Sequence, residues 1–390
     1  MKVLVVARSG WPFPAPPGGA DMVALRQALA LARAGADVRL VGQGSLSDGA
    51  ASPKLVFLDA HVSRTIGSTS QAAYYFKVLA LAIVAGLRGA GAIRRDPSIS
   101  VVHCHHSVSV VMVRLMAPRR PTVLTVHDNP FDRSDLSGSV LERFVRVANN
   151  LVLERLGVAL ADRVVGVSPE VVRRLRRWGC PDAKIVEIWP TAPERAADAE
   201  GDEPDASVEP ASHGSFLLSV GDLTQRKRMD LLLRALPRLQ PDLRLVIVGR
   251  GPRKAEFQQL AGALGLGERV TFLDYVDDAT LRRLQRTARV AVLVSEREGL
   301  PTSLIEAVAE GTPAFYATVR AVSVPDTRPY LVHLVTSSPE AVADAVGQLC
   351  AQVDAGLSKG EVQQWARQHF PSTAAAAETL LKLYAGIAAS

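Results

Sequence analysis

Short apolar runs alternate with amphipathic helical segments along most of this 390-residue chain. The runs lie at Val3–Val6, Val38–Val41, Val101–Val102, Thr122–Val126, Val164–Val167, Phe216–Val220, Leu243–Val248, Val270–Leu273 and Val290–Val294. Strands that alternate with helices form parallel sheets covered by helices on both faces. The alternation occurs in both halves, and no fixed-period repeat accompanies it. We therefore expect an α/β fold with a parallel sheet in each half.

The length and one biased segment divide the chain. A chain of 390 residues is too long for one core and suits two domains of about 190 residues each. The segment PTAPERAADAEGDEPDASVEPASHG (Pro190–Gly214) is rich in Pro, Ala and acidic residues and lacks periodicity, which is typical of a linker or surface loop. We expect one domain over residues 1–190, a linker over 191–213 and a second domain over 214–360.

The charge of the chain is unevenly distributed. The net charge is +6, yet seven acidic residues and one arginine lie between Glu194 and Glu209, so the rest of the chain is distinctly basic. The runs VVRRLRRW (Val171–Trp178) and TLRRLQRTAR (Thr280–Arg289) could meet anionic lipid, nucleic acid or a phosphorylated substrate, or form solvated helix faces. No nucleic-acid-binding motif accompanies them, so we expect no nucleic-acid partner and leave peripheral membrane contact open.

Location is indicated by three features. The most hydrophobic helical segment, Ala72–Gly91, is interrupted by Lys77 and Arg88. The apolar run between these charges is shorter than the roughly 20 residues needed to cross a bilayer, so we expect a buried or interfacial helix. Met1 directly precedes the first strand, which predicts no signal peptide. The cysteines have no metal-binding spacing and leave one unpaired; they are Cys104, Cys180 and Cys350. We expect reduced thiols in a cytoplasmic protein, at most peripheral to the inner face of the membrane.

The stretch SEREGLPTSLIEAVAEGTP (Ser295–Pro313) predicts a short turn and a helix directly after a strand. Proline at the start and Gly311 at the end favour a helix over Pro301–Glu310. Leu300 cannot cap this helix with a side-chain oxygen, so the amides of its first turn, at Thr302, Ser303 and Leu304, are free to hold an anion. Doubly wound folds bind ligands at this edge of the sheet, and we expect a phosphate there.

A second motif supplies cations. In SVGDLTQRKRMDLLLRAL (Ser219–Leu236), Gly221 permits a turn after a strand, and three cations crowd the entrance to a helix; they are Arg226, Lys227 and Arg228. They could be a solvated basic first turn. Because the helix dipole disfavours cations at its start, their placement also suggests an anion bound from outside.

The motifs VGDLTQRKRMDLLLRAL, LVIVGRGP, RVTFLDYV and VSEREGLPTSLIEAVAEGTP occur in this order, and the set resembles the C-terminal half of the retaining nucleotide-sugar glycosyltransferases of family 4. MKVLVVARSG, PPGGADMVALRQALALARAGADVRLV and VLTVHDN resemble that family's N-terminal half. The resemblance implies the GT-B fold, in which two Rossmann-like domains face each other across a cleft. It also implies that terminal helices, residues 361–390, return to the N-terminal domain, with Trp365, Phe370, Leu380, Leu381 and Tyr384 as packing residues.

The resemblance implies a retaining, metal-independent hexosyltransferase of class EC 2.4. The donor would be a nucleoside-diphosphate sugar, with uridine preferred to guanosine as the base. The acceptor would be a small molecule, a lipid-linked sugar or a glycan. No cofactor beyond the sugar nucleotide is expected, and the oligomeric state is not indicated.

The resemblance also assigns site residues. His127, Lys227 and Glu298 would be catalytic: Lys227 on the donor diphosphate, Glu298 on hydroxyls of the transferred sugar, and His127 near the donor sugar and acceptor. Glu306 would accept bonds from the ribose hydroxyls. The donor-binding set is Gly18, Gly19, Arg226, Lys227, Arg228, Tyr275, Val276, Glu298, Gly299, Leu300, Pro301, Thr302, Ser303 and Glu306. His105 and Asp128 are weaker candidates for acceptor contact. HCHH (His103–His106) superficially resembles a metal motif but has no carboxylate or cysteine partner at suitable spacing, so no metal is expected.

Two departures from the family keep alternatives open. Asp222 stands where the family usually has a phosphate-binding arginine, which Arg226 or Arg228 would have to replace. Paired glycines expected after GTPAFYAT are absent, and Val319–Tyr330 stands in their place. The alternatives are a non-catalytic nucleotide-sugar-binding partner protein with the same fold and a sugar-nucleotide epimerase.

Overall fold

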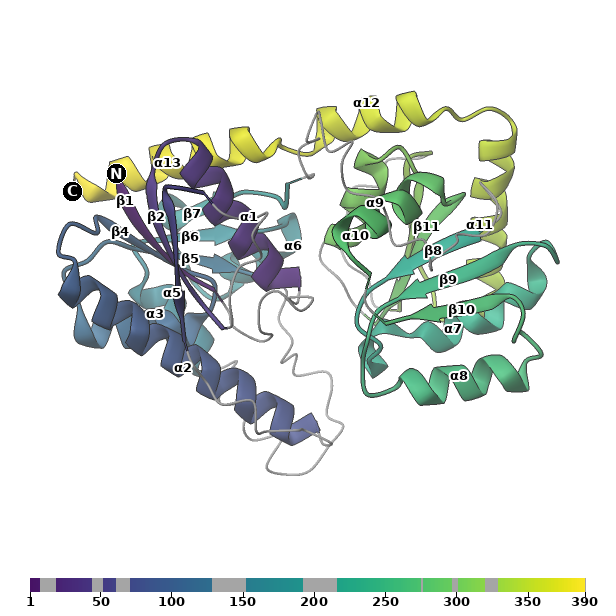
Figure 1. Ribbon diagram of the computed structural model, residues 1–390, viewed down its shortest axis with the longest axis horizontal. Helices are drawn as coiled ribbons and strands as arrows, with labels where there is room; N and C mark the ends of the chain where they lie inside the picture. Colours follow the sequence, from purple (N-terminus) through teal and green to yellow (C-terminus); the bar gives the residue numbers. More distant parts are fainter. Residues whose placement is uncertain are drawn as a thin grey trace. The chain divides into compact units, whose positions relative to one another are not determined.

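A computed structural model describes residues 1–7, 19–43, 52–60, 71–127, 152–191, 216–274, 276–296, 301–319 and 329–389. The chain forms two compact units (Figure 1): Met1–Trp189 with Thr373–Ser390, and Pro190–Ser372. Most of the acidic segment expected as a linker lies outside the described residues.

The described part of the first unit contains a parallel sheet of seven strands in the order β3-β2-β1-β4-β5-β6-β7. The strands are β1 (Lys2–Val6), β2 (Asp37–Gly42), β3 (Leu55–Asp59), β4 (Val101–Cys104), β5 (Thr122–Val126), β6 (Arg163–Gly166) and β7 (Ile185–Glu187). The central strands β4 and β5 are buried along their whole length, as their continuous apolar runs predict. Strand order reverses between β1 and β4, which makes this the topological switch point of the sheet.

Helices cover both faces of this sheet. They are α1 (Gly19–Arg33), α2 (Gln71–Arg95), α3 (Ser107–Met116), α5 (Glu154–Leu160), α6 (Pro169–Arg177), the short 3-10 turn η3 (Asp182–Lys184) and α13 (Thr373–Ala388). One core lies between the sheet and α1 with α13, and a second core lies under α2, α3, α5 and α6. Leu81 and Ala85 of α2 are fully buried, which confirms a core position for that part of the expected hydrophobic helix. Among the described helices, none combines the length and apolar character needed to cross a bilayer.

The described part of the second unit contains a parallel sheet of six strands in the order β10-β9-β8-β11-β12-β13. The strands are β8 (Phe216–Val220), β9 (Arg244–Val248), β10 (Val270–Leu273), β11 (Val290–Ser295), β12 (Ala314–Thr318) and β13 (Leu331–Val335). The helices and 3-10 turns are η4 (Gln225–Lys227), α7 (Met229–Ala235), η5 (Leu236–Arg238), α8 (Lys254–Ala263), α9 (Asp278–Thr287), α10 (Thr302–Ala309), α11 (Pro339–Asp354) and α12 (Lys359–His369). The main core lies between the sheet and α7, α8 and α11. Strand order reverses between β8 and β11, so the loops after these two strands flank the switch point.

The C-terminal segment is divided between the two units. The buried side chains of α13, among them Leu380 and Tyr384, pack in the same core as α1. In contrast, α12 lies against α10 in the second unit (Figure 1). There Trp365 stacks on Tyr330 with ring centroids 5.5 Å apart. The expected returning segment began at residue 361, whereas the first unit takes up the chain again at Thr373.

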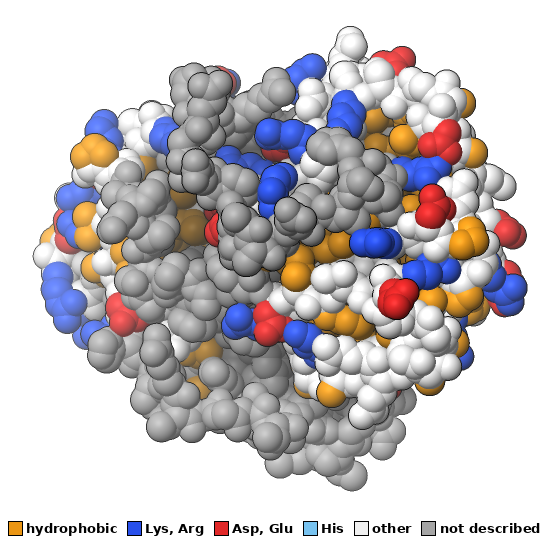
Figure 2. Space-filling model, turned by 45° about the vertical axis from the view of Figure 1, so that its right-hand side comes forward, with side chains coloured by type: hydrophobic (Ala, Val, Ile, Leu, Met, Phe, Trp, Pro, Cys, Tyr) orange, Lys and Arg blue, Asp and Glu red, His pale blue; other side chains and the backbone are white. Residues whose placement is uncertain are grey.

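The two arginine-rich runs form the helices α6 and α9. On α6, Arg173 and Arg177 both pair with Glu170, while the last arginine of α9, Arg286, pairs with Glu310 of the neighbouring turn. On the face drawn in Figure 2, Lys and Arg side chains are interspersed with Asp and Glu. Each of these pairs neutralises part of the positive charge of its helix, and the pairs on α6, which are partly exposed, contribute little stability.

All three cysteines are buried and free, in agreement with the expectation of reduced thiols. Burial raises the pKa of the Cys350 thiol to about 11 and raises the pKa of Cys104 further. These thiols therefore remain protonated at neutral pH and are poor nucleophiles.

Candidate active site

The loops after β8 and β9 are held together by backbone hydrogen bonds at the carboxyl edge of the second sheet. The amide of Gly221 donates to the carbonyl of Val248 at 3.0 Å, and the amide of Leu223 donates to the carbonyl of Arg250 at 2.8 Å. A Cβ atom added at Gly249 would lie 2.0 Å from the carbonyl oxygen of Gly221. Only glycine, which has no Cβ atom, allows this approach, and this explains why Gly249 is the residue that follows β9.

Gly251, two residues after Gly249, is under the same steric constraint. A Cβ atom there would lie 2.2 Å from the carbonyl oxygen of Leu223 and within 2.6 Å of two further atoms of that residue's backbone. The carbonyl of Leu223 in turn accepts a hydrogen bond from the amide of Arg253 at 3.1 Å. The VGDL and VGRGP loops therefore form one rigid junction, in which neither backbone has room to move away.

Lys227 lies at this junction. It ends η4, and its amide donates to the carbonyl of Thr224 at 3.2 Å. A Cβ atom added at Gly221 would lie 3.7 Å from the Nζ atom of Lys227, so the ammonium group lies over this glycine. The half-buried lysine thus places its charge above the loop that leaves β8.

The turn at η4 is tied to the end of β11. The carbonyl of Arg226 accepts hydrogen bonds from the Ser295 hydroxyl at 3.0 Å and from the Glu296 amide at 2.6 Å. The chain leads from β11 towards α10, the helix expected to bind phosphate. The cation-bearing turn and the approach to α10 therefore belong to adjacent strands at the switch point.

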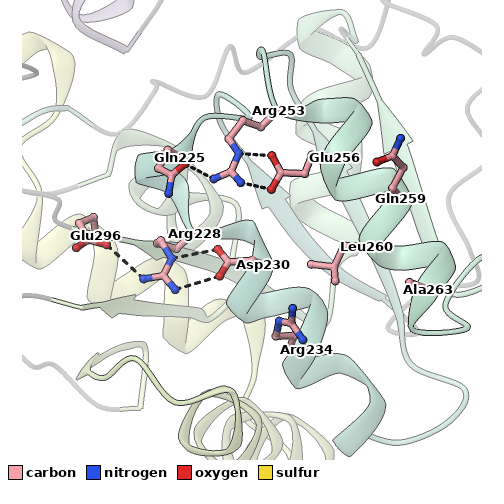
Figure 3. A pocket seen from close by; sticks show the side chains of 10 residues that line it. All are labelled: Gln225, Arg228, Asp230, Arg234, Arg253, Glu256, Gln259, Leu260, Ala263 and Glu296. Carbon is pink, nitrogen blue, oxygen red and sulfur yellow. Dashed lines mark hydrogen bonds and ion pairs between the residues drawn. The ribbon is translucent and has the colours of Figure 1, made fainter. Parts of the chain in front are cut away.

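Arg228 is engaged in ion pairs. Its guanidinium group binds both carboxylate oxygens of Asp230 at 3.0 and 3.1 Å and also binds Glu296 at 3.3 Å (Figure 3). The hydrogen bonds to Asp230, and then those to Glu296, raise the pKa of Arg228. Its backbone adopts the left-handed conformation, with φ of 38°, which is uncommon for a residue with a side chain. Arg228 would have to leave two carboxylates before it could compensate for Asp222.

A hollow of about 690 Å³ lies beside Arg228 (Figure 3). It is lined by Gln225, Arg228, Asp230, Arg234, Arg253, Glu256, Gln259, Leu260, Ala263 and Glu296. Arg253 bonds to both Glu256 and Gln225. Two arginines of the hollow, Arg228 and Arg253, are therefore already paired with carboxylates that line it. Lys227 does not line it, and we do not assign the donor phosphates to this hollow.

The helix α10 begins one residue later than expected, because Pro301 is the N-cap with an extended backbone and not the first helical residue. The carbonyl of Pro301 accepts from the amide of Leu304 at 3.1 Å, so Leu304 is not available to an anion as expected. Within the described part of the chain, no side chain caps the helix. Among the described residues, the amides of Thr302 and Ser303 have no backbone partner, which leaves two donors at the helix start.

Glu306 lies in the middle of α10 and is only 9% exposed. Its Oε2 atom accepts a hydrogen bond from Nε2 of Gln285, a buried residue of α9, at 3.1 Å. The amide holds the carboxylate in one orientation. Gln285 was not predicted, because a glutamine in an arginine-rich amphipathic helix gives no local sign of its partner.

The three histidines at the end of β4 and directly after it have different hydrogen-bond partners. His103 bonds to the hydroxyls of Tyr384 and Thr125, each at 2.6 Å, and Nδ1 of His106 accepts from the amide of Val108 at the start of α3. Nδ1 of His105 lies 3.0 Å from Nε2 of His127. Among the described residues, no group of three or more His, Cys, Asp or Glu side chains could hold a metal ion.

Burial keeps two of these histidines neutral. It lowers the pKa of His103 to about 3, and burial together with the charges of His103 and His127 lowers the pKa of His105 well below its usual value. The unfolded chain takes up these protons near pH 6.5 while the folded chain does not. We expect the free energy of unfolding of the first unit to fall below pH 6.5, by about 1.4 kcal/mol per pH unit for each histidine.

Urea denaturation between pH 7.5 and 4.5 measures this effect. In His103→Gln the titrating group is gone, so the pH slope should decrease by about 1.4 kcal/mol per unit relative to the natural sequence. Parallel pH profiles for the two proteins would contradict the assignment of a buried neutral His103.

Several expected site residues lie outside the described residues; they are Gly18, Asp128, Tyr275, Glu298, Gly299 and Leu300. Gly19 is the first residue of α1 and not part of the preceding loop. Val276 is 8% exposed and packs with Leu284 of α9 in a core cluster beneath the sheet. Asp222 is exposed at the junction loop.

Two family models match successive parts of the chain. Residues 18–190 match the glycosyl transferase 4-like domain, and residues 203–350 match the glycosyl transferases group 1. Sucrose-phosphate synthase from Thermosynechococcus elongatus superposes with a TM-score of 0.75 at 21% identity, over 100% of this chain and 99% of that one. The fold is thus GT-B, and the chain belongs to the group 1 glycosyltransferases of family 4.

Curated relatives match only part of the chain, whereas the solved structure matches all of it. A D-inositol 3-phosphate glycosyltransferase of Mycobacteroides abscessus is 37% identical over 173 residues, 42% of this chain and 38% of that protein. The protein of the same description from Mycolicibacterium gilvum is 29% identical over 69% of this chain and 63% of its own length. The matched part thus spans less than two thirds of either relative.

Proposed function

We propose that this protein transfers a sugar from a nucleoside-diphosphate sugar to an acceptor with retention of configuration. The observation that carries the proposal is the placement of Lys227 over Gly221 at the switch point of the second sheet, next to the strand that leads to α10. Phosphates bind where oriented amides and a cation converge, and the described start of α10 offers the Thr302 and Ser303 amides.

The proposed roles of the described residues combine this placement with the family resemblance. Lys227 and the start of α10 stabilise the negative charge that develops on the departing nucleoside diphosphate. Glu306, fixed by Gln285, accepts hydrogen bonds from the ribose hydroxyls. By family resemblance, His127 lies near the transferred sugar and the acceptor. The retaining outcome comes from membership of the family and not from a spacing between carboxylates.

Donor specificity is tested by binding before turnover. Uridine, guanosine and thymidine diphosphates are added separately, and the shift in Tm is measured; the matching glucose and mannose nucleotides are then tested for release of the diphosphate. We expect the largest shift with UDP. If none of the three diphosphates shifted Tm at millimolar concentration, the result would contradict the presence of a donor site.

Asp222 favours one alternative, a binding protein that has lost turnover, because its carboxylate would repel a diphosphate. Comparison of the natural sequence with Asp222→Arg distinguishes the two functions. In a working transferase, in which Arg226 supplies the missing charge, the substitution should be neutral or harmful. Transfer that appears only in Asp222→Arg would show that the natural sequence is a binding protein.

Activity should persist in a chelator. A lysine and a helix start provide the positive charge that a divalent ion provides in metal-dependent transferases, so 5 mM EDTA, a concentration on the order of that used to strip exchangeable ions, should leave the rate within about twofold. If EDTA abolished activity and magnesium or manganese restored it, Lys227 and the start of α10 would not be sufficient to stabilise the charge of the departing diphosphate.

A further inference from the structure

We propose that His105 is a positioning residue that donates a hydrogen bond from Nδ1 to Nε2 of His127 and so holds His127 as the tautomer with its proton on Nδ1. The inference rests on the proposed function, in which His127 meets the transferred sugar. It replaces the expectation that His105 itself contacts the acceptor, because His105 is only 2% exposed and its Nδ1 atom lies 3.0 Å from His127.

The position of His105 follows from the fold. It directly follows β4, next to the switch point of the first sheet, and its ring lies close to two others. The ring centroid of His103 is 4.7 Å away and that of His127 is 5.3 Å away. The neighbouring His103 bonds to the hydroxyls of Tyr384 and Thr125. The buried ring of His105 lies close to that of His103 and bonds directly to His127.

The protonation state of His105 follows from its surroundings. Burial, and then the positive charges that His103 and His127 would carry, lower its pKa well below the usual value, so the imidazole is neutral and has a single N–H. Its Nε2 atom is buried and has no hydrogen-bond partner among the residues that the structure describes. A buried N–H without a partner is less tolerated than a buried acceptor, so the proton belongs on Nδ1, in the bond to His127.

The tautomer of His127 is then determined. Its Nε2 atom accepts from His105, so a neutral His127 must carry its proton on Nδ1. The backbone of His127 is held as well, since its carbonyl accepts from the guanidinium of Arg174 on α6 at 2.8 Å. The Nδ1 atom of His127 thus carries an N–H donor rather than a lone pair.

Nitrogen-15 NMR of histidine-labelled protein tests the tautomer directly and needs no donor. The signals of His127 are assigned by their loss in His127→Gln. In the natural sequence we expect the pattern of a ring protonated at Nδ1. A His127 ring protonated at Nε2 would overturn the proposal, whether or not the protein transfers sugar, and so would an unchanged His127 pattern in His105→Phe.

Three substitutions at His105 then separate positioning from packing, with release of UDP from UDP-glucose as the probe reaction. His105→Phe keeps the buried ring but removes the donor, and we expect kcat to fall roughly 10- to 100-fold with little change in KM. His105→Asn places an amide nitrogen near the position of Nδ1 and should recover most of kcat. His105→Gln places it near the position of Nε2 and should not.

The matched control is Thr125→Val, which removes one oxygen from the same buried cluster without touching the bond between His105 and His127. It should leave the tautomer of His127 and kcat unchanged. Equal losses of kcat in His105→Phe, His105→Asn and Thr125→Val would show that only packing matters and would refute positioning. Absence of UDP release from the natural sequence would count against the proposed function alone, because the tautomer is measured separately.

Discussion

Gly251→Ala should destabilise the second unit by about 3 kcal/mol or more, because the new Cβ atom has no space. It would lie 2.2 Å from the carbonyl oxygen of Leu223, and the nearest atoms all belong to that residue's backbone. A flexible side chain could rotate away from such a contact. This backbone cannot, since Leu223 is hydrogen-bonded through its amide to Arg250 and through its carbonyl to Arg253.

Hydrogen exchange followed by mass spectrometry locates the effect. We expect faster exchange in Gly251→Ala over β8 and β9, with the first unit unchanged. Gly262→Ala is the matched control, because a Cβ atom there has nothing within 4 Å and the residue lies on α8. Alanine in a helix should stabilise this variant by up to about 1 kcal/mol. Equal stability of the two variants would contradict the rigid junction.

Lys227→Ala should weaken binding of UDP by roughly 30- to 1000-fold. The loss of a charge-assisted phosphate contact costs about 2 to 4 kcal/mol, and each 1.4 kcal/mol corresponds to a factor of ten. The substitution shortens a half-buried side chain that lies over Gly221, so the fold should be retained. Isothermal titration calorimetry with UDP measures the change in Kd.

Lys359→Ala controls for the overall charge of the second unit. Lys359 is an exposed residue at the start of α12 whose ammonium donates to the backbone carbonyl of Arg286, and its replacement removes the same charge. We expect its Kd for UDP to change less than about threefold at 0.15 M salt, where exposed charges are screened beyond about 8 Å. Equal losses in Lys227→Ala and Lys359→Ala would mean that Lys227 makes no direct contact.

Much of the fold was predictable because its signals are local. Each expected apolar run coincides with a strand, and Gly311 follows α10 with a φ of 92°, as the glycine stop predicts. The strands not predicted include β3, β7 and β13, which lie at sheet edges. Edge strands are short or partly exposed, so their apolar pattern is weaker. The unpredicted β12 is fully buried and pairs with β11 on one side and β13 on the other, a placement that only the sheet shows.

In the candidate site, too, some features depend on the local sequence and others on the tertiary structure. The amino-acid sequence alone determined which residue types cluster near the ends of β8 and β11, because glycines, the proline and the run of cations act within a few residues of one another. Only the tertiary structure decided the state of each side chain. Arg228 is held by Glu296, Glu306 by Gln285, and His103 by Tyr384, 281 positions away. Hydrogen bonds between distant segments depend on packing geometry to within tenths of an ångström, which no local pattern of residues encodes.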